Sequence, residues 1–213
     1  AADAAGAWGS IGFTSGIYPL ARPLLPRTGQ CWRSENAEFQ PLGDTAALRI
    51  VGVDHLKLLG VFRFVDMAGR TAAQPAVFAR SLRYAQIDHL FIQNWYKGID
   101  LEGDTAGAGT NENVFLDLYM QVRHRGLNLE GSCHDNKFVQ VWVKGPAPDN
   151  WASGAGIRIA TAGVQGGNSI ARCQILDMQT GLDCPGAYEF WFGTVVADNA
   201  FGSAVYIAGS CER

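Results

Sequence analysis

The sequence has little charge, no long hydrophobic run and no closely spaced cysteine pair. Only 17% of its 213 residues are charged, and the net charge of -3 offers no basic surface to nucleic acid. No apolar stretch is long enough for a membrane-spanning helix, so membrane insertion is not expected. No segment has the capped, 3.6-residue periodicity of a long helix. These absences favour short strands and turns, in agreement with the 26 glycines.

The cysteines and histidines also lack the spacings of known covalent or metal frameworks. An odd, widely spaced set of cysteines argues against a disulfide scaffold, and we expect reduced, mostly buried thiols. This set consists of Cys31, Cys133, Cys173, Cys184 and Cys211. The histidines form no HxH or HExxH pattern. The sequence therefore predicts no histidine-based metal site and no cofactor.

Two strings separated by 28 residues share one template. Residues 98–104 read Gly-Ile-Asp-Leu-Glu-Gly-Asp, and residues 126–132 read Gly-Leu-Asn-Leu-Glu-Gly-Ser. A recurring template is typical of repeat architectures, and looser copies begin at Gly156, Gly181 and Ala204. Each copy alternates apolar and polar residues before a turn former, which predicts a short strand with one buried face.

The N-terminal segment differs from these repeats. It contains Phe13-x-x-Gly16-x-Tyr18, a proline-rich stretch to Pro26, and a Gly-x-x-Trp-x-Ser-Glu turn over residues 29–35. This order resembles the entry segment of pectate-lyase-like right-handed parallel β-helices, especially those of phage tailspikes and of head spikes on phage-like particles such as gene transfer agents. The resemblance implies an all-β, right-handed parallel β-helix of about six or seven rungs. Residues 1–45 would cap it, and residues 46–213 would form its rungs within a single domain.

Asparagines recur at a fixed place in the repeat. Asn113 and Asn168 each lie 13 positions before a template glycine, and Asn136 starts an equivalent strand. In the family that this chain resembles, such asparagines stack in a turn as a hydrogen-bonded ladder. The resemblance therefore implies a structural role for them.

The strands between the template copies alternate in a way that predicts an external apolar stripe. Leu116, Leu118, Met120 and Val122 would face the core. The opposite face would then carry two apolar columns, namely Ile87, Phe115, Phe138, Ile170 and Trp191, and Phe91, Tyr119, Trp142, Gln174 and Val195. Monomeric soluble proteins rarely leave such a stripe bare.

We expect this stripe to be a subunit interface formed by Phe115, Tyr119, Phe138, Trp142 and Trp191. The resemblance to tailspikes implies that the assembly is a homotrimer. Two alternatives remain: a loop or the chain's own ends cover the stripe, or Tyr119 and Trp142 stack against sugar rings.

The template strands would present a polar column to solvent. It comprises Asp100, Asn128, Arg158, Asp183 and Tyr206, a set able to hydrogen-bond a run of sugar hydroxyls. In the neighbouring column, Glu102 and Glu130 would lie one rung apart, near the carboxyl separation of retaining glycosidases. With Asp100 they could instead hold a calcium ion. Both columns could equally be the ordinary polar exterior of a soluble β-helix.

The predicted function is that of a surface spike on a phage or phage-like particle. It would stand among other virion proteins and bind capsular polysaccharide on the host cell. One alternative is a polysaccharide depolymerase, either a glycoside hydrolase or a lyase, with Glu102 and Glu130 as its catalytic residues. The catalytic signatures of pectate lyases and polygalacturonases cannot be placed on this sequence, which favours binding over catalysis. A purely structural virion component is the remaining alternative.

Overall fold

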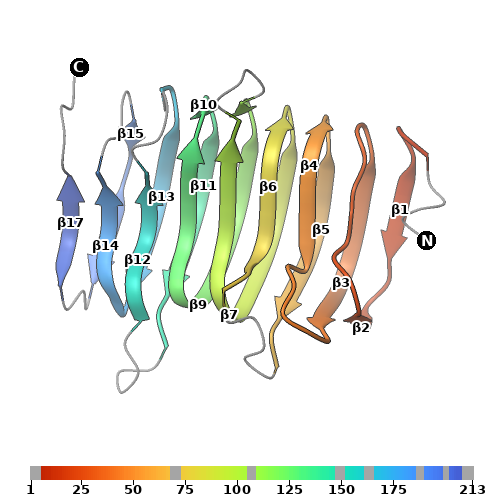
Figure 1. Ribbon diagram of the computed structural model, residues 1–213, viewed down its shortest axis with the longest axis horizontal. Coiled ribbons are helices and arrows are strands. Elements are labelled where there is room, and N and C mark those ends of the chain that lie inside the picture. Colours follow the sequence, from red (N-terminus) through yellow and green to blue (C-terminus); the bar gives the residue numbers. More distant parts are fainter. Residues whose placement is uncertain are drawn as a thin grey trace.

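The computed structural model describes residues 6–67, 73–104, 109–146, 152–160, 166–185, 190–198 and 202–207. These residues form parallel strands stacked into a β-solenoid of about six turns. The stack runs along the long axis of the molecule, from β1 near the N-terminus to β17 near the C-terminus (Figure 1). The described residues include no helix, and so none that could cross a membrane. The predicted all-β, parallel β-helical architecture is confirmed.

Seventeen strands follow one another along the described part of the chain. They are β1 (Ser10–Phe13), β2 (Gly16–Leu20), β3 (Cys31–Pro41), β4 (Leu48–Asp54), β5 (Lys57–Val65), β6 (Pro75–Arg83), β7 (Gln86–Gly103), β8 (Thr110–Asn111), β9 (Val114–Gly131), β10 (Cys133–His134), β11 (Lys137–Lys144), β12 (Ala152–Ile159), β13 (Ser169–Leu176), β14 (Met178–Cys184), β15 (Trp191–Phe192), β16 (Val195–Asp198) and β17 (Ser203–Ile207).

Parallel pairing places most of these strands on two faces, while β8 and β10 form a short third stack. The glycine-led face consists of β4, β6, the ends of β7 and β9, β12, β14 and β17. The bent face consists of β3, β5, the first parts of β7 and β9, β11, β13, β15 and β16. Stacked strands lie about 4.8 Å apart, so equivalent residues form columns along the solenoid.

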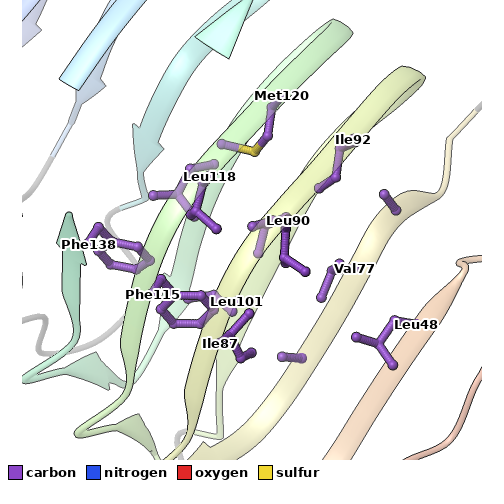
Figure 2. Close-up of a cluster of buried hydrophobic side chains, with 14 of the residues drawn as sticks. Leu48, Val77, Ile87, Leu90, Ile92, Leu101, Phe115, Leu118, Met120 and Phe138 are labelled. Atoms are coloured by element: carbon purple, nitrogen blue, oxygen red, sulfur yellow. The ribbon is translucent and has the colours of Figure 1, made fainter. Parts of the chain in front are cut away.

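The core fills the space between the two faces. On the glycine-led face, Ile99, Leu101, Leu127 and Leu129 are fully buried, as the sequence predicts. Figure 2 shows Leu101 from this face together with Phe115 and Leu118 from the bent face, all members of one buried cluster. Val205, in the final strand β17, is 52% exposed because no described strand covers it from the C-terminal side.

The glycine that opens each template copy allows the rungs to approach closely. A Cβ atom on Gly98 would lie 2.4 Å from the carbonyl oxygen of Gly126, and one on Gly126 would lie 2.5 Å from that of Gly156. The same contact recurs at Gly181, at 2.4 Å from the carbonyl oxygen of Ala204. Only glycine fits where backbone meets backbone at this distance.

The structure does not show a separate N-terminal cap. β1 and β2 both pair in parallel with β3, and β3 pairs in parallel with β5. Residues 10–41 are therefore already part of the stack, on the N-terminal side of the predicted boundary at residue 46. The first five residues lie outside the described part of the chain.

Three of the four described cysteines are buried, as expected. Cys133, Cys173 and Cys184 lie in the core, Cys31 is partly exposed, and all four are free thiols. Burial raises the pKa of Cys133 and of Cys173 to about 12. These two thiols therefore remain protonated at physiological pH. Cys211 lies outside the described residues.

The predicted asparagine ladder is present in one corner of the solenoid. Asn113, Asn136 and Asn168 are fully buried. Asn113 Nδ2 donates to Asn136 Oδ1 at 2.8 Å, and Asn136 Nδ2 donates to Asn168 Oδ1 at 3.0 Å. Each amide also donates to a backbone carbonyl, as Asn136 Nδ2 does to Thr110 O at 2.9 Å. The asparagine ladder thus provides hydrogen bonds for buried backbone groups of the turn, which the hydrogen bonds between strands do not reach.

The ladder predicts a large loss of stability from a small substitution. In Asn136→Ala, the carbonyl of Thr110 loses a side-chain donor and the backbone N–H of Asn113 loses its side-chain acceptor while both remain buried. Each such group costs about 1–3 kcal/mol, so we expect the free energy of unfolding, measured in urea, to fall by about 3 kcal/mol. Asn36→Ala, at an exposed strand position, is the matched control. Equal stability of the two variants would contradict the structural role of the ladder.

Candidate functional site

The bent face turns at a column of residues with left-handed backbone. His89, Asp117, Gln140 and Arg172 have φ values of 52°, 51°, 60° and 55°. Such values are uncommon for residues other than glycine, yet here they recur on successive rungs. The strands β7, β9, β11 and β13 are therefore kinked at the same place, and the alternation of their side chains is interrupted there.

This kink overturns part of the predicted stripe. Phe115 points inward before the kink, and Leu118 points inward again after it, whereas an uninterrupted strand would place them on opposite sides. Phe115 and Phe138 are fully buried, with ring centroids 4.9 Å apart (Figure 2). Their predicted position on an external stripe was wrong, as was that of Ile87 and Ile170, which are also fully buried.

The end of the stripe is displaced by one residue. Trp191 pairs with Ser169, so Phe192 rather than Trp191 follows Ile170. Val196, not Val195, follows Gln174. Trp191 is nevertheless 71% exposed, and its role in a subunit interface stays a prediction.

Beyond the kink, the second predicted column does point outward and lines an open groove. Phe91, Tyr119 and Trp142 stand on successive rungs and are partly exposed. Ring centroids are 5.7 Å apart between Phe91 and Tyr119, and 4.2 Å apart between Tyr119 and Trp142. We call the groove of about 690 Å³ that they line the aromatic groove; its wall also includes His89, Asp117, Gln140, Arg172 and Gln174.

The polar wall of the aromatic groove offers both donors and acceptors. Among the described residues, the guanidinium of Arg172 forms no ion pair, and the amides of Gln140 and Gln174 are exposed. Burial raises the pKa of the Tyr119 hydroxyl, so that hydroxyl remains neutral at physiological pH. The groove therefore combines flat apolar ring faces with hydrogen-bonding groups along one edge.

A group of three potential metal ligands lies at one end of this groove. His89 Nδ1 is 2.8 Å from Asp88 Oδ1, and His89 Nε2 is 3.2 Å from Asp117 Oδ2. The sequence did not predict this group, because Asp117 comes from the next rung, 28 positions further along the chain from His89. The 28-residue offset of the template copies was a usable signal, since it aligns His89 with Asp117.

The polar column on the glycine-led face has the predicted register but not the predicted exposure. Phe78, Asp100, Asn128, Arg158 and Asp183 follow one another on successive rungs, and the backbone of Tyr206 continues the column. Asp100 is only 7% exposed and Asn128 only 2%, so the expectation of an open surface was wrong for both. The side chain of Tyr206 lies outside the described part.

Charged residues on this face are largely paired with one another. Arg158 lies 3.4 Å from Asp183. Glu102 and Glu130 lie on adjacent rungs, as predicted. Glu102 accepts hydrogen bonds from Arg80, whose Nε is 3.0 Å away. Glu130 is exposed. Asp100, Glu102 and Glu130 do not converge into a metal-ligating group in the described part of the chain.

Comparison with known proteins does not decide between these surfaces. No known protein family, no curated protein and no solved structure matches the chain significantly. What the fold defines is the architectural class, a parallel β-solenoid. Membership of the pectate-lyase-like family and relation to phage spikes have no support beyond the resemblance of the N-terminal segment and the asparagine spacing.

The corrected orientation of the two aromatic columns is testable by truncation. Phe138→Ala leaves a cavity in the core, so we expect it to lower the free energy of unfolding by about 3–5 kcal/mol. Trp142→Ala removes a partly exposed ring whose main neighbour is Tyr119, and we expect a loss of about 1 kcal/mol. Urea denaturation measures both. A larger loss for Trp142→Ala than for Phe138→Ala would contradict this orientation.

The buried carboxyl of Asp100 predicts a pH effect on stability. Burial raises its pKa, and Lys97, 3.4 Å away, lowers it in part. Because the folded-state pKa lies above the unfolded value of about 3.9, stability falls as pH rises through that interval. Asp100→Asn removes the charge, so we expect a variant that is more stable at neutral pH and less dependent on pH. Unfolding at a series of pH values tests this. A less stable variant at neutral pH would mean that the Lys97 ion pair outweighs burial.

Proposed function

We propose that this protein binds polysaccharide along the aromatic groove, and that it does so as a surface spike of a phage or phage-like particle. The observation that carries the binding proposal is the pair of partly exposed rings of Tyr119 and Trp142, which lie in an open groove beside the polar side chains of Gln140, Arg172 and Gln174. Sugar rings present apolar C–H faces and polar hydroxyl edges, and this groove offers a counterpart to each.

The dimensions of this row of aromatic rings suit an extended chain better than a compact ligand. Phe91, Tyr119 and Trp142 occupy three successive rungs, and two rung intervals span roughly 10 Å. The groove is open to solvent along this length, so a polymer can enter from the side without threading. Arg172 and Gln140, on the kink column, lie along the same groove and can orient the hydroxyl or carboxylate groups of the bound chain.

The glycine-led face is less suited to this role than the sequence suggested. Asp100 and Asn128 are almost fully covered, and Arg158 and Asp183 are directed toward each other. A ligand there would first have to break an existing ion pair. We therefore propose the aromatic groove as the sugar-binding site. It replaces the predicted site formed by Asp100, Asn128, Arg158, Asp183 and Tyr206.

The virion setting and the trimer are supported by the family resemblance alone. Phe115 and Phe138 of the predicted interface belong to the core, whereas a role for Tyr119, Trp142 and Trp191 in association stays a prediction. An assembly of several chains would still favour function, because rigidly linked weak sites gain avidity without new contacts.

One observation favours the depolymerase alternative. Glu102 and Glu130 lie on adjacent rungs, where one carboxyl could act as acid and the other as nucleophile. They belong to the glycine-led face, whereas the aromatic groove lies on the bent face. Cleavage by this pair would therefore not depend on Trp142, and the two functions can be tested separately.

Trp142→Ala is the most informative variant for binding. The test measures adhesion of wild type and variant to a panel of neutral and acidic bacterial capsular polysaccharides by biolayer interferometry. A central aromatic contact contributes about 2 kcal/mol or more, so we expect at least about a tenfold loss of affinity. Trp191→Ala is the matched control, because Trp191 is an exposed tryptophan outside the groove.

Other results would redirect or reject the proposal. Unchanged binding by Trp142→Ala together with loss in an Arg158→Ala, Asp183→Ala double variant would move the site to the glycine-led face. Release of oligosaccharide by wild type but not by Glu102→Gln or Glu130→Gln would establish the depolymerase. Absence of binding to every polysaccharide in the panel would favour a purely structural role.

A further inference from the structure

We propose that Asp88, His89 and Asp117 bind a divalent cation, Zn²⁺ in preference to Mn²⁺, at the end of the aromatic groove. One ligand atom from each residue lies within 4.8 Å of the others. Two carboxylates and an imidazole form a mixed oxygen and nitrogen set of the kind that zinc accepts. This inference does not depend on the groove binding polysaccharide.

The distances within the group suit a small cation. Around a tetrahedral zinc ion with ligands at about 2.0 Å, neighbouring ligand atoms are roughly 3.3 Å apart. The separation of 3.2 Å between His89 Nε2 and Asp117 Oδ2 already has this value. Asp88 Oδ1 now faces the other ring nitrogen, Nδ1, at 2.8 Å, so a rotation of the Asp88 side chain is needed to bring an oxygen to the same ion.

The charges and hydrogen bonds of the group are incomplete without a ligand. Within the described residues, neither Asp88 nor Asp117 forms an ion pair with lysine or arginine, and His89 is the partner of both. Asp88 Oδ1 and His89 Nδ1 are shielded from solvent and lie 2.8 Å apart, yet they do not meet in hydrogen-bond geometry. Buried polar atoms without hydrogen bonds are rare, and a cation bound by Asp88 Oδ1 would satisfy that oxygen.

The fold holds the group in place. His89 and Asp117 occupy equivalent positions of the kink column, and the strand residues on both sides of them are paired in register. Their backbones are therefore fixed before any ion arrives. The side chains of Asp88, His89 and Asp117 are 19%, 45% and 35% exposed, which leaves an open side where water or a ligand hydroxyl can complete the coordination.

The experiment titrates chelator-treated protein with ZnCl₂ by calorimetry, without any sugar present. We expect one zinc ion per chain, weaker binding of MnCl₂, and no displacement of zinc by equimolar CaCl₂. His89→Asn and Asp117→Asn should each weaken zinc binding by at least about tenfold. Asparagine tolerates the left-handed backbone, so neither substitution should disturb the kink.

Asp135→Asn is the matched control. Asp135 has the same backbone conformation as Asp117, with φ of 56°, and its carboxylate lies 3.1 Å from His134 in a simple surface pair. It should bind zinc as wild type does. The proposal is overturned if wild type binds no zinc, if His89→Asn and Asp117→Asn bind it unchanged, or if Asp135→Asn alone loses it. Since no sugar is used, failure of zinc binding leaves the polysaccharide proposal to its own test.

Discussion

Parallel stacking in register places every side chain of this solenoid in a column of equivalent residues. A residue type that suits one rung must therefore suit its neighbours about 4.8 Å above and below. Asn113, Asn136 and Asn168 use this constraint by sharing one chain of amide hydrogen bonds. Gly98 and Gly126 meet the same constraint because glycine has no Cβ atom. A Cβ at either position would clash with the backbone of the next rung. The ladder and the glycine contacts together fix the register on which the core and the groove both depend.

The left-handed column gives the bent face two surfaces of opposite character. Before the kink, the large rings of Phe115 and Phe138 point into the core. After it, the rings of Tyr119 and Trp142 point toward solvent and line the groove. The residues at the kink, Asp117 among them, are directed to the same groove. One backbone feature thus separates the residues that stabilise the solenoid from those available to a ligand.

The sequence predicted the features that repeat and missed those that interrupt the repeat. The template copies, the buried leucines of the glycine-led face and the asparagine ladder all follow from spacing or resemblance. The inward position of Phe115 could not be predicted from alternation, because the alternation is interrupted at the kink. The kink could not be predicted either, since it is formed by four different residue types, His89, Asp117, Gln140 and Arg172. Burial of Asp100 was equally hidden, since it depends on neighbouring rungs. The alignment of His89 with Asp117 could have been read from the 28-residue offset of the template copies, but the orientation of their side chains toward each other could not.

A groove with aromatic rings, free polar groups and a proposed cation at one end favours recognition of a polymer over chemistry on a small molecule. The central claim is that sugar binds to the rings beyond the kink. A crystal structure with an oligosaccharide prepared from a bound polysaccharide tests this most directly. We expect a sugar ring stacked on Trp142, with polar groups toward Gln140 and Arg172. Sugar density over Arg158 and Asp183 on the glycine-led face would contradict the claim.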